Sequence, residues 1–326
     1  MKKPLGNREI LERISAEISG GTLSHAYIIC APAGGGKKTL AGYIANSVLC
    51  LENKNGEPCG RCHACAMLNG GGHPDLTVIK PTGDKEKSIK IDDIREAKAS
   101  CYIKPVVGAR RVFIVENAET MRADCQNALL KILEEPPEGT LFLLLTDNVE
   151  RLLPTVRSRC VALYLPPLDE ENIQALLPKS TRLTAEQIAA FSGGIAGDAL
   201  YYSVGEGYNI YNDAVSFLET LCKSSVYEFL KYRDKIGKSR QVADRMLSCI
   251  LKIFRDVCLM KEDVNAPFYF TDSREVIENA ANKLTKKSLD NIINILQKLK
   301  TEAGNNAYDL KLCTMSALLL CWEEVH

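Results

Sequence analysis

The sequence predicts an α/β domain, with a parallel sheet covered by helices on both faces, followed by an all-helical region. Up to about residue 165, short apolar runs alternate with helical patterns, and most are separated by stretches long enough for a crossover helix. From Asp169 onward, strand-like runs disappear and helical periodicity takes over. The 326 residues, 46% hydrophobic and 25% charged, are typical of a soluble globular protein of two or three domains.

Five apolar runs bounded by turn residues are the expected strands of the sheet. They are Ala26–Cys30, Leu76–Ile79, Val112–Val115, Leu141–Leu145 and Val161–Leu165. Pro166-Pro167 ends the last strand and opens a new region. The α/β domain is therefore expected to cover residues 1–166.

Short helices are expected between residues 167 and 207. One is Glu170–Leu177, one is opened by Thr184, and one begins near Gly197. Gly205-Glu206-Gly207 then separates them from a longer helical block, which is expected to cover residues 208–326.

Two apolar stretches of this long block have helical spacing. One helical face carries Leu289, Ile292, Ile293, Leu296 and Leu299, and another carries Tyr308, Leu312, Met315 and Leu319. We expect the block to be a helical packing or oligomerisation domain.

The charge and the cysteine usage exclude several classes of protein. Lysine plus arginine and aspartate plus glutamate both number 41, so the chain does not coat a polyanion by bulk charge. No apolar run approaches the ~18–20 residues of a membrane span, and the N-terminus lacks the apolar core of a signal peptide. The 13 cysteines are an odd number, and their arrangement does not resemble a secreted disulfide framework. We expect a cytoplasmic protein.

A glycine-rich segment leads from the first predicted strand into a helix, which is the context of a phosphate-binding loop. Against the pattern G-x-x-x-x-G-K-[ST], Gly36 and Lys37 fit, but Ala31 replaces the first glycine and Lys38 replaces the hydroxyl residue that would hold Mg²⁺. The loop is therefore degenerate, and binding of ATP or ADP is weak or absent. Its candidate cofactor-binding residues are Gly34, Gly36, Lys37 and Thr39. The alternative is a glycine-rich turn without a ligand.

The third predicted strand leads into Glu116-Asn117, where an ATPase usually carries Asp-Glu. Glu116 keeps a carboxylate for the metal, but Asn117 cannot accept a proton and so removes the base. Since two parts of the hydrolytic apparatus are altered, we expect no intrinsic ATP hydrolysis.

Four cysteines have the spacing of metal ligands: Cys50, Cys59, Cys62 and Cys65. Soft thiolates in a tetrahedral array suit Zn²⁺, and a closed four-ligand site is structural. His63 lies between two of them and could replace one. An iron–sulfur cluster and four unrelated buried thiols are the alternatives. We expect a structural zinc in an insertion at about residues 50–72.

Ser158-Arg159-Cys160 precedes the fifth predicted strand, at an expected edge of the sheet. A guanidinium there can reach a neighbouring subunit's nucleotide and stabilise charge on the transferring phosphate. An arginine bonded to its own backbone or to acidic neighbours fits the sequence equally well.

Several segments in this order resemble the clamp-loader ATPases of the AAA+ superfamily. They are Ser24–Tyr27, the degenerate glycine loop, the four-cysteine insertion, His73–Asp75, Asn127–Pro137 and Ser158–Cys160. The resemblance covers residues 24–160, and the rest matches in helical character and length. It implies an AAA+ nucleotide-binding-like domain (1–166), a small helical lid (167–207), and a helical collar (208–326) that joins subunits in a ring.

The resemblance also implies partners and roles. In this family, motor subunits hydrolyse ATP, and a rigid non-hydrolysing subunit contributes its Ser-Arg-Cys arginine in trans. Lys38 and Asn117 favour the non-hydrolysing subunit, as does Gly197, which stands where a motor subunit carries an arginine that senses the γ-phosphate. Arg159 would then be the catalytic residue in trans, with Ser158 and Cys160 as its motif neighbours.

The partners would be the motor subunits and the delta subunit of the ring, with the sliding clamp and primed DNA reached through the complex. Two other functions stay open: an active ATPase motor of the same ring, and a P-loop nucleotide kinase with a zinc-stabilised lid. Lys38 and Asn117 stand against both alternatives, and the additional helical third stands against the kinase.

Overall fold

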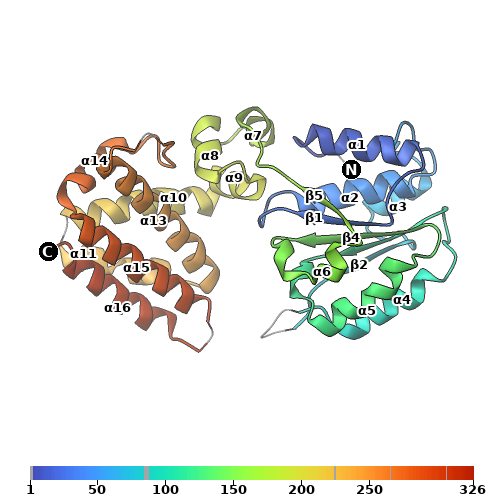
Figure 1. Cartoon of the computed structure of the whole chain (residues 1–326). Coiled ribbons are helices and arrows are strands. Elements are labelled where there is room, and N and C mark those ends of the chain that lie inside the picture. The colour runs from blue at the N-terminus through green and yellow to red at the C-terminus, as the bar shows by residue number, and fades with distance from the viewer. Residues whose placement is uncertain (1–2, 84–87, 224, 265, 306) are drawn as a thin grey trace. The chain divides into compact units, whose positions relative to one another are not determined.

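The structure is a computed structural model that describes all residues except 1–2, 84–87, 224, 265 and 306. It divides into two compact units (Figure 1). An α/β unit comprises residues 1–168 and 195–197, and a helical unit comprises residues 169–194 and 198–326. The predicted fold class, a parallel sheet with helices on both faces followed by a helical region, is confirmed.

The α/β unit is built on a five-stranded parallel sheet with the order β2-β3-β4-β1-β5. The strands are β1 (Ala26–Cys30), β2 (Leu76–Ile79), β3 (Arg111–Val115), β4 (Thr140–Thr146) and β5 (Val161–Tyr164). Each lies where the sequence predicts it, with ends that differ by at most one residue. Because all strands are parallel, their carboxyl ends lie at one edge of the sheet, where ligand sites of such sheets form.

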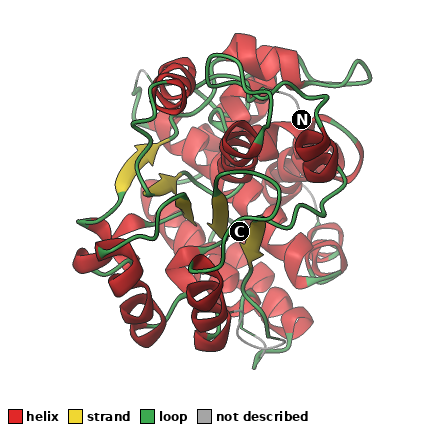
Figure 2. Cartoon of the chain, turned by 90° about the vertical axis from the view of Figure 1, so that its right-hand side faces the viewer, coloured by secondary structure: helices red, strands yellow, loops and turns green. Residues whose placement is uncertain are grey.

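Helices cover both faces of this sheet (Figures 1 and 2). On one face lie α1 (Arg8–Ser19) and α2 (Lys37–Leu49). On the other lie α4 (Ile91–Cys101), α5 (Ala123–Glu134) and α6 (Pro154–Arg157). Strands β3 and β4 are buried along their whole length, which explains why they appear in the sequence as continuous apolar runs. The remaining elements are α3 (His63–Asn69) and the short 3₁₀ helices η1 (Ala118–Thr120) and η2 (Val149–Arg151).

Residues 169–203 contain the three short helices that the sequence predicts. They are α7 (Glu170–Leu176), α8 (Ala185–Ser192) and α9 (Ala196–Ser203). The Thr184 side chain accepts a hydrogen bond from the Gln187 amide, and the Gln187 side chain accepts one from the Thr184 amide. This reciprocal capping fixes the start of α8.

The remaining helices are α10 (Gly205–Lys223), α11 (Val226–Leu230), α12 (Tyr232–Ile236), α13 (Arg240–Lys261), α14 (Arg274–Lys283), α15 (Lys286–Ala303) and α16 (Leu310–Glu323). Helix α10 begins at Gly205, so the glycines expected to separate two blocks lie in its first turn. A Cβ atom on Gly207 would lie 2.0 Å from the carbonyl oxygen of Tyr201. Gly207 therefore permits a close approach of two helices, and a division of lid and collar at residue 207 stays a prediction.

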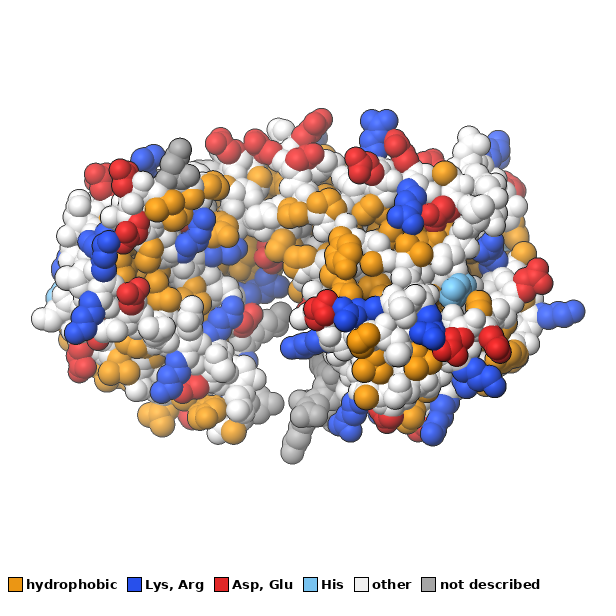
Figure 3. Space-filling view, viewed as in Figure 1, with side chains coloured by type: hydrophobic (Ala, Val, Ile, Leu, Met, Phe, Trp, Pro, Cys, Tyr) orange, Lys and Arg blue, Asp and Glu red, His pale blue; other side chains and the backbone are white. Residues whose placement is uncertain are grey.

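The two apolar faces predicted near the C-terminus have different surroundings. On α15, the predicted face is buried at Leu289, Ile292, Leu296 and Leu299. The second face lies at the surface instead: Leu312 and Leu319 on α16 are 70% and 41% exposed, and Tyr308, which precedes the helix, is 46% exposed. In Figure 3, hydrophobic side chains are visible at the surface where α16 lies in Figure 1. Helix α16 is held in the unit by another face, which contains Thr314, Ala317, Leu318 and Cys321. Among the helices of the described residues, none is long and apolar enough to cross a bilayer.

Candidate functional site

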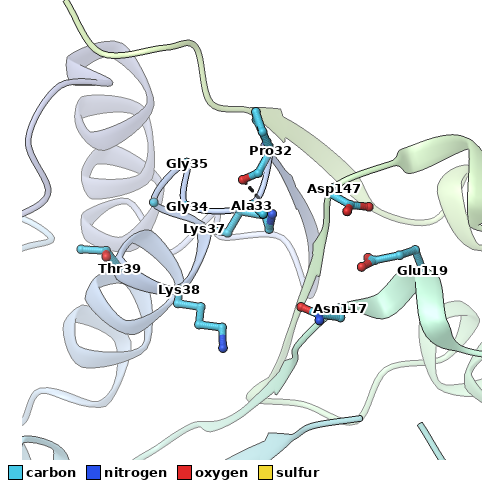
Figure 4. Close-up of a pocket in the computed structure, with 11 residues that line it drawn as sticks. Pro32, Ala33, Gly34, Gly35, Lys37, Lys38, Thr39, Asn117, Glu119 and Asp147 are labelled. Carbon is cyan, nitrogen blue, oxygen red and sulfur yellow. Dashed lines mark hydrogen bonds between the residues drawn. The ribbon is translucent and has the colours of Figure 1, made fainter. Parts of the chain in front are cut away.

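The glycine loop connects the carboxyl end of β1 to the start of α2. Gly34 and Gly36 have φ values of +80° and +93°, which favour glycine, and Gly36 is the N-cap of α2. The loop lines a pocket of about 330 Å³, with Asn117, Glu119 and Asp147 on the opposite side (Figure 4). Asn117 lies beyond the end of β3 and Asp147 beyond that of β4, because parallel strands present their carboxyl ends at the same edge.

Lys37 is turned toward its own loop. Its Nζ donates hydrogen bonds to the carbonyl oxygens of Ala31 at 2.5 Å and Pro32 at 3.1 Å, the second of which is drawn in Figure 4. Burial lowers the pKa of Lys37. The lysine that would reach a terminal phosphate therefore has partners within the chain.

Lys38 also has a partner within the chain. Its Nζ lies 2.6 Å from Oε2 of Glu116, and Lys80 Nζ lies 3.8 Å from the other carboxylate oxygen. A lysine cannot donate a lone pair to a metal ion, and Asn117 is no base. The residues at this end of the pocket therefore do not fit a bound Mg²⁺.

A segment far along the chain closes on the glycine loop within the α/β unit. The Gly197 amide donates a hydrogen bond to the Gly34 carbonyl oxygen at 2.9 Å. A Cβ atom on Gly197 would lie 2.8 Å from Cα of Gly34. The sequence identifies Gly197 as a departure from the family. A single sequence cannot show that Gly197 contacts Gly34, which lies 163 positions earlier in the chain.

The four predicted metal-ligand cysteines converge. Their sulfur atoms all lie within 4.8 Å of one another, and the Cys50 and Cys62 sulfurs are 3.8 Å apart. Tetrahedral zinc with Zn–S bonds of ~2.3 Å requires sulfur separations of ~3.8 Å. The donor set and its spacing thus fit a metal ion. His63, at the start of α3, is exposed and lies outside the cluster, so it does not replace a cysteine.

The cluster is prepared for metal binding by its surroundings. Cys50, Cys62 and Cys65 are buried, and Cys59 is half-buried. Burial opposes ionisation of Cys62, but hydrogen bonds from the backbone at Cys65 and Leu51 and from neighbouring thiols outweigh it, so that its pKa falls to about 6. Burial raises the pKa of Cys65 to about 12. A metal ion binds thiolates, so the hydrogen bonds that favour the ionised form of Cys62 also favour metal binding.

The insertion that carries the cysteines packs on α1. Gly56 has a φ of +77°, and a Cβ atom there would lie 2.0 Å from the Ser15 carbonyl oxygen. The Asn53 side chain accepts a hydrogen bond from the Gly56 amide at 2.9 Å and donates one to Ser47. The turn at residues 53–56 therefore attaches the insertion to the body of the unit.

Arg159 lies in an open pocket that also contains His25, Leu133 and Glu134. Its Nη2 lies 2.6 Å from the Glu134 carboxylate, and its Nη1 donates to the Thr155 carbonyl oxygen at 2.9 Å. A third contact joins Nη1 to Oγ of Ser158 at 3.2 Å. This is the arrangement in which the arginine is bonded to its own backbone and an acidic neighbour, the second of the two considered above. The Arg159 side chain is nevertheless 32% exposed.

Cys160 contributes by packing, whereas its motif neighbours Ser158 and Arg159 make hydrogen bonds. Burial raises the pKa of its thiol to about 12, so it packs as a small apolar side chain. The sequence did not identify Glu134 as a partner of Arg159. Glu134 is the last residue of α5, and only the packing of that helix against the sheet brings it to β5.

A family model described as DNA polymerase III, delta subunit, matches residues 6–169. The delta-prime subunit of DNA polymerase III from Pseudomonas aeruginosa is 38% identical over 175 residues, which are 52% of this chain and 53% of that protein. The delta-prime subunit from Bacillus subtilis is 27% identical over 306 residues, 91% of each chain. The gamma/tau subunit from Mycobacterium tuberculosis is 30% identical over 234 residues, 72% of this chain and 39% of that protein. The match thus spans about half or less of the Pseudomonas and Mycobacterium relatives.

Among solved structures, a DNA polymerase III gamma subunit-related protein from Thermotoga maritima superposes with a TM-score of 0.56 at 17% identity. The superposition covers 98% of this chain and 100% of that protein. At this level of identity the likeness concerns the fold alone.

Proposed function

Because this chain belongs to the DNA polymerase III delta subunit family, we propose that it is a delta-prime-like, non-hydrolysing subunit of a bacterial clamp loader. In this role it helps to load the sliding clamp on primed DNA during replication. Its partners are ATPase motor subunits and a delta subunit, arranged with it in a ring. The chain acts as an accessory subunit of the polymerase holoenzyme and has no catalytic activity of its own.

One contrast carries this proposal: the chain's own phosphate loop is disabled while Arg159 is retained in an open pocket. In the loop, Lys37 binds carbonyl oxygens and Lys38 binds Glu116. Asn117 cannot accept a proton from water, so it is no general base. Arg159, by contrast, has a half-exposed carboxylate as its ionic partner, which a phosphate with greater negative charge can displace.

We further propose that Arg159 acts in trans on a nucleotide bound by a neighbouring motor subunit. Its fork of N–H groups suits a phosphate, and it stands two residues before β5, an edge strand of the sheet. Ser158 orients the guanidinium through its hydroxyl, and Cys160 anchors the turn through its partly buried side chain.

The four-cysteine cluster is assigned to a structural Zn²⁺. Its thiolate-only donors and short sulfur separations support zinc, and four protein ligands leave no open position for catalysis. The ion would fix the insertion between α2 and β2, which includes α3.

We also assign residues 167–207 to a lid and residues 208–326 to a collar that joins subunits. The exposed face of α16 supports the collar assignment, since Tyr308 and Leu312 border a groove of about 300 Å³ between α15 and α16. Apolar side chains that recur on one exposed face are typical of a surface that another subunit covers.

ATP hydrolysis by purified proteins tests the proposal. The chain alone should hydrolyse ATP no faster than background, and it should raise turnover when added to the motor and delta subunits with clamp and primed DNA. Turnover by the chain alone that Lys37→Ala abolishes would instead indicate a motor subunit. Phosphate transfer to a nucleotide or nucleoside by the chain alone would indicate a kinase.

A further inference from the structure

The carboxylate of Glu116 is held between two lysines, of which Lys38 lines the phosphate-loop pocket. Glu116 directly follows β3, and its side chain is 12% exposed. Its Oε2 accepts a hydrogen bond from Lys38 at 2.6 Å, and its Oε1 lies 3.8 Å from the Lys80 ammonium. Lys38 belongs to the first turn of α2, whereas Lys80 follows β2. Both oxygens of one carboxylate therefore face cations from two different elements.

In a metal-dependent nucleotide site, a carboxylate after this strand and a hydroxyl at position 38 would serve the Mg²⁺ ion. Here the two ammonium groups together carry the charge of one divalent ion. Magnesium requires oxygen ligands at ~2.0–2.1 Å in near-octahedral geometry. Lys38 offers no such ligand and occupies the oxygen of Glu116 that a metal would need.

We propose that Lys38, with Lys80 beside it, takes the place of the divalent metal ion in this pocket and joins the phosphate loop to β3 without metal or nucleotide. This inference rests on the proposed function, in which the chain does not hydrolyse ATP. It assigns a positive role to a residue that otherwise counts only as a lost metal ligand.

The position of Lys38 in the chain explains how one ion pair acts on the loop. Helix α2 begins at Lys37, so the ion pair between Lys38 and Glu116 restrains the helix end that forms one wall of the pocket. Lys37 holds the carbonyl oxygens at the start of the loop, and the Gly197 amide holds Gly34 in its middle. The loop is thus attached at its start, middle and end by groups of this chain, where a nucleotide site uses phosphate and metal.

A cycle of variants tests the ion pair in the purified full-length chain. Lys38→Met should increase amide hydrogen exchange in residues 33–39 and lower the melting temperature by about 2 °C, the scale of one half-exposed ion pair. Glu116→Gln should have a similar effect, and the double variant should be no less stable than either single variant, because both remove one interaction. Lys80→Met is the matched control and should have a smaller effect, since its ammonium is farther from Glu116. Additive losses in the double variant would overturn the inference.

The response to magnesium tests whether the lysines take the place of the metal ion. The melting temperature of the natural chain should be the same in EDTA and in MgCl₂, with or without ATP. The variant Lys38→Thr with Lys80→Met frees Glu116 and supplies a hydroxyl, so MgCl₂ with ATP should raise its melting temperature. A Mg²⁺-dependent rise in the natural chain, or no rise in the folded variant, would overturn the inference. ATP turnover measured in the same samples tests the proposed function separately, because the natural chain can hydrolyse no ATP and still respond to Mg²⁺.

Discussion

The cysteine cluster and the Arg159 pocket lie in the same α/β unit. The chain supplies all four protein ligands of the cluster, whereas the Arg159 pocket is open to a further group. All four sulfurs of the cluster come from one short segment and lie within 4.8 Å of one another. Arg159 is 32% exposed and its partner Glu134 is 49% exposed, in a pocket open to solvent. The first site needs only an ion, whereas the second has a charged group whose present partner can be exchanged. Sequence spacing identifies a site of the first kind and only suggests one of the second.

The same difference separates α15 from α16 in the helical unit. Both carry apolar side chains at helical spacing, but Leu296 is buried and Leu312 is 70% exposed. Periodicity shows that a face is apolar; it does not show whether the same chain or another chain covers it.

The largest expected effect is at the cluster, where the chain itself holds every ligand. We expect the natural protein to bind about one zinc ion per chain, and we expect Cys62→Ser to lose this ion and to unfold at a melting temperature lower by several degrees. The reason is that metal binding and local folding are coupled. Elemental analysis and thermal unfolding measure both. Cys101→Ser, at a buried cysteine outside the cluster, should keep its metal. Full metal retention in Cys62→Ser would show that the cluster is not the site.

The second effect distinguishes the two apolar helix faces. Leu296→Ala should lower the free energy of unfolding by about 2–5 kcal/mol because it removes a buried side chain. Leu312→Ala should change it by less than ~0.5 kcal/mol but weaken binding to partner subunits. Denaturant unfolding and analytical ultracentrifugation of the reconstituted complex measure these changes. Equal losses of stability would mean that the α16 face is covered within the chain.

The third effect concerns Arg159 and should appear only in the complex. An arginine finger contributes ~10³–10⁵ to phosphate transfer at one site, but other interfaces of the ring would keep their own arginines. Arg159→Ala should therefore reduce stimulated ATP hydrolysis and clamp loading by several-fold in total. The isolated chain should unfold at nearly the same temperature, because a half-exposed ion pair stabilises it by ~0–1 kcal/mol.

Arg157→Ala is the matched control for Arg159, since it removes a nearby arginine that pairs with Glu150 at 2.5 Å. It should leave stimulated ATP hydrolysis intact. Intact assembly together with intact hydrolysis in Arg159→Ala would exclude a role in trans. Poor folding of the isolated Arg159→Ala chain would instead favour a structural role.

The smallest effect tests whether Glu134 competes with phosphate for Arg159. Glu134→Gln removes the carboxylate but keeps the size of the side chain. It should lower the ATP concentration for half-maximal hydrolysis by the complex by about two- to fivefold, the equivalent of one exposed ion pair. The maximal rate should not change. Glu135→Gln, at the next residue, should change neither value. A fall in the maximal rate in Glu134→Gln would indicate that the carboxylate positions Arg159 instead.

The sequence predicted elements and sites that depend on neighbours along the chain. Strands such as β1 were located because their apolar runs end at turn residues, and the cysteines because their ligand spacing is local. The sequence did not predict that Lys38 pairs with Glu116, because that contact depends on the packing of α2 beside β3. It also missed the contact of Glu134 with Arg159, for the same reason. Whether the apolar face of α16 is buried depends on what surrounds it, which no helical period encodes.

The contact between Gly197 and Gly34 limits the order in which substitutions could convert this chain into a motor subunit. Any side chain at position 197, including the arginine of a motor subunit, would place its Cβ atom 2.8 Å from the Gly34 Cα. Restoring that arginine first would therefore meet the loop backbone, whatever the state of positions 38 and 117. The loop has to be rebuilt before position 197 can accept a side chain.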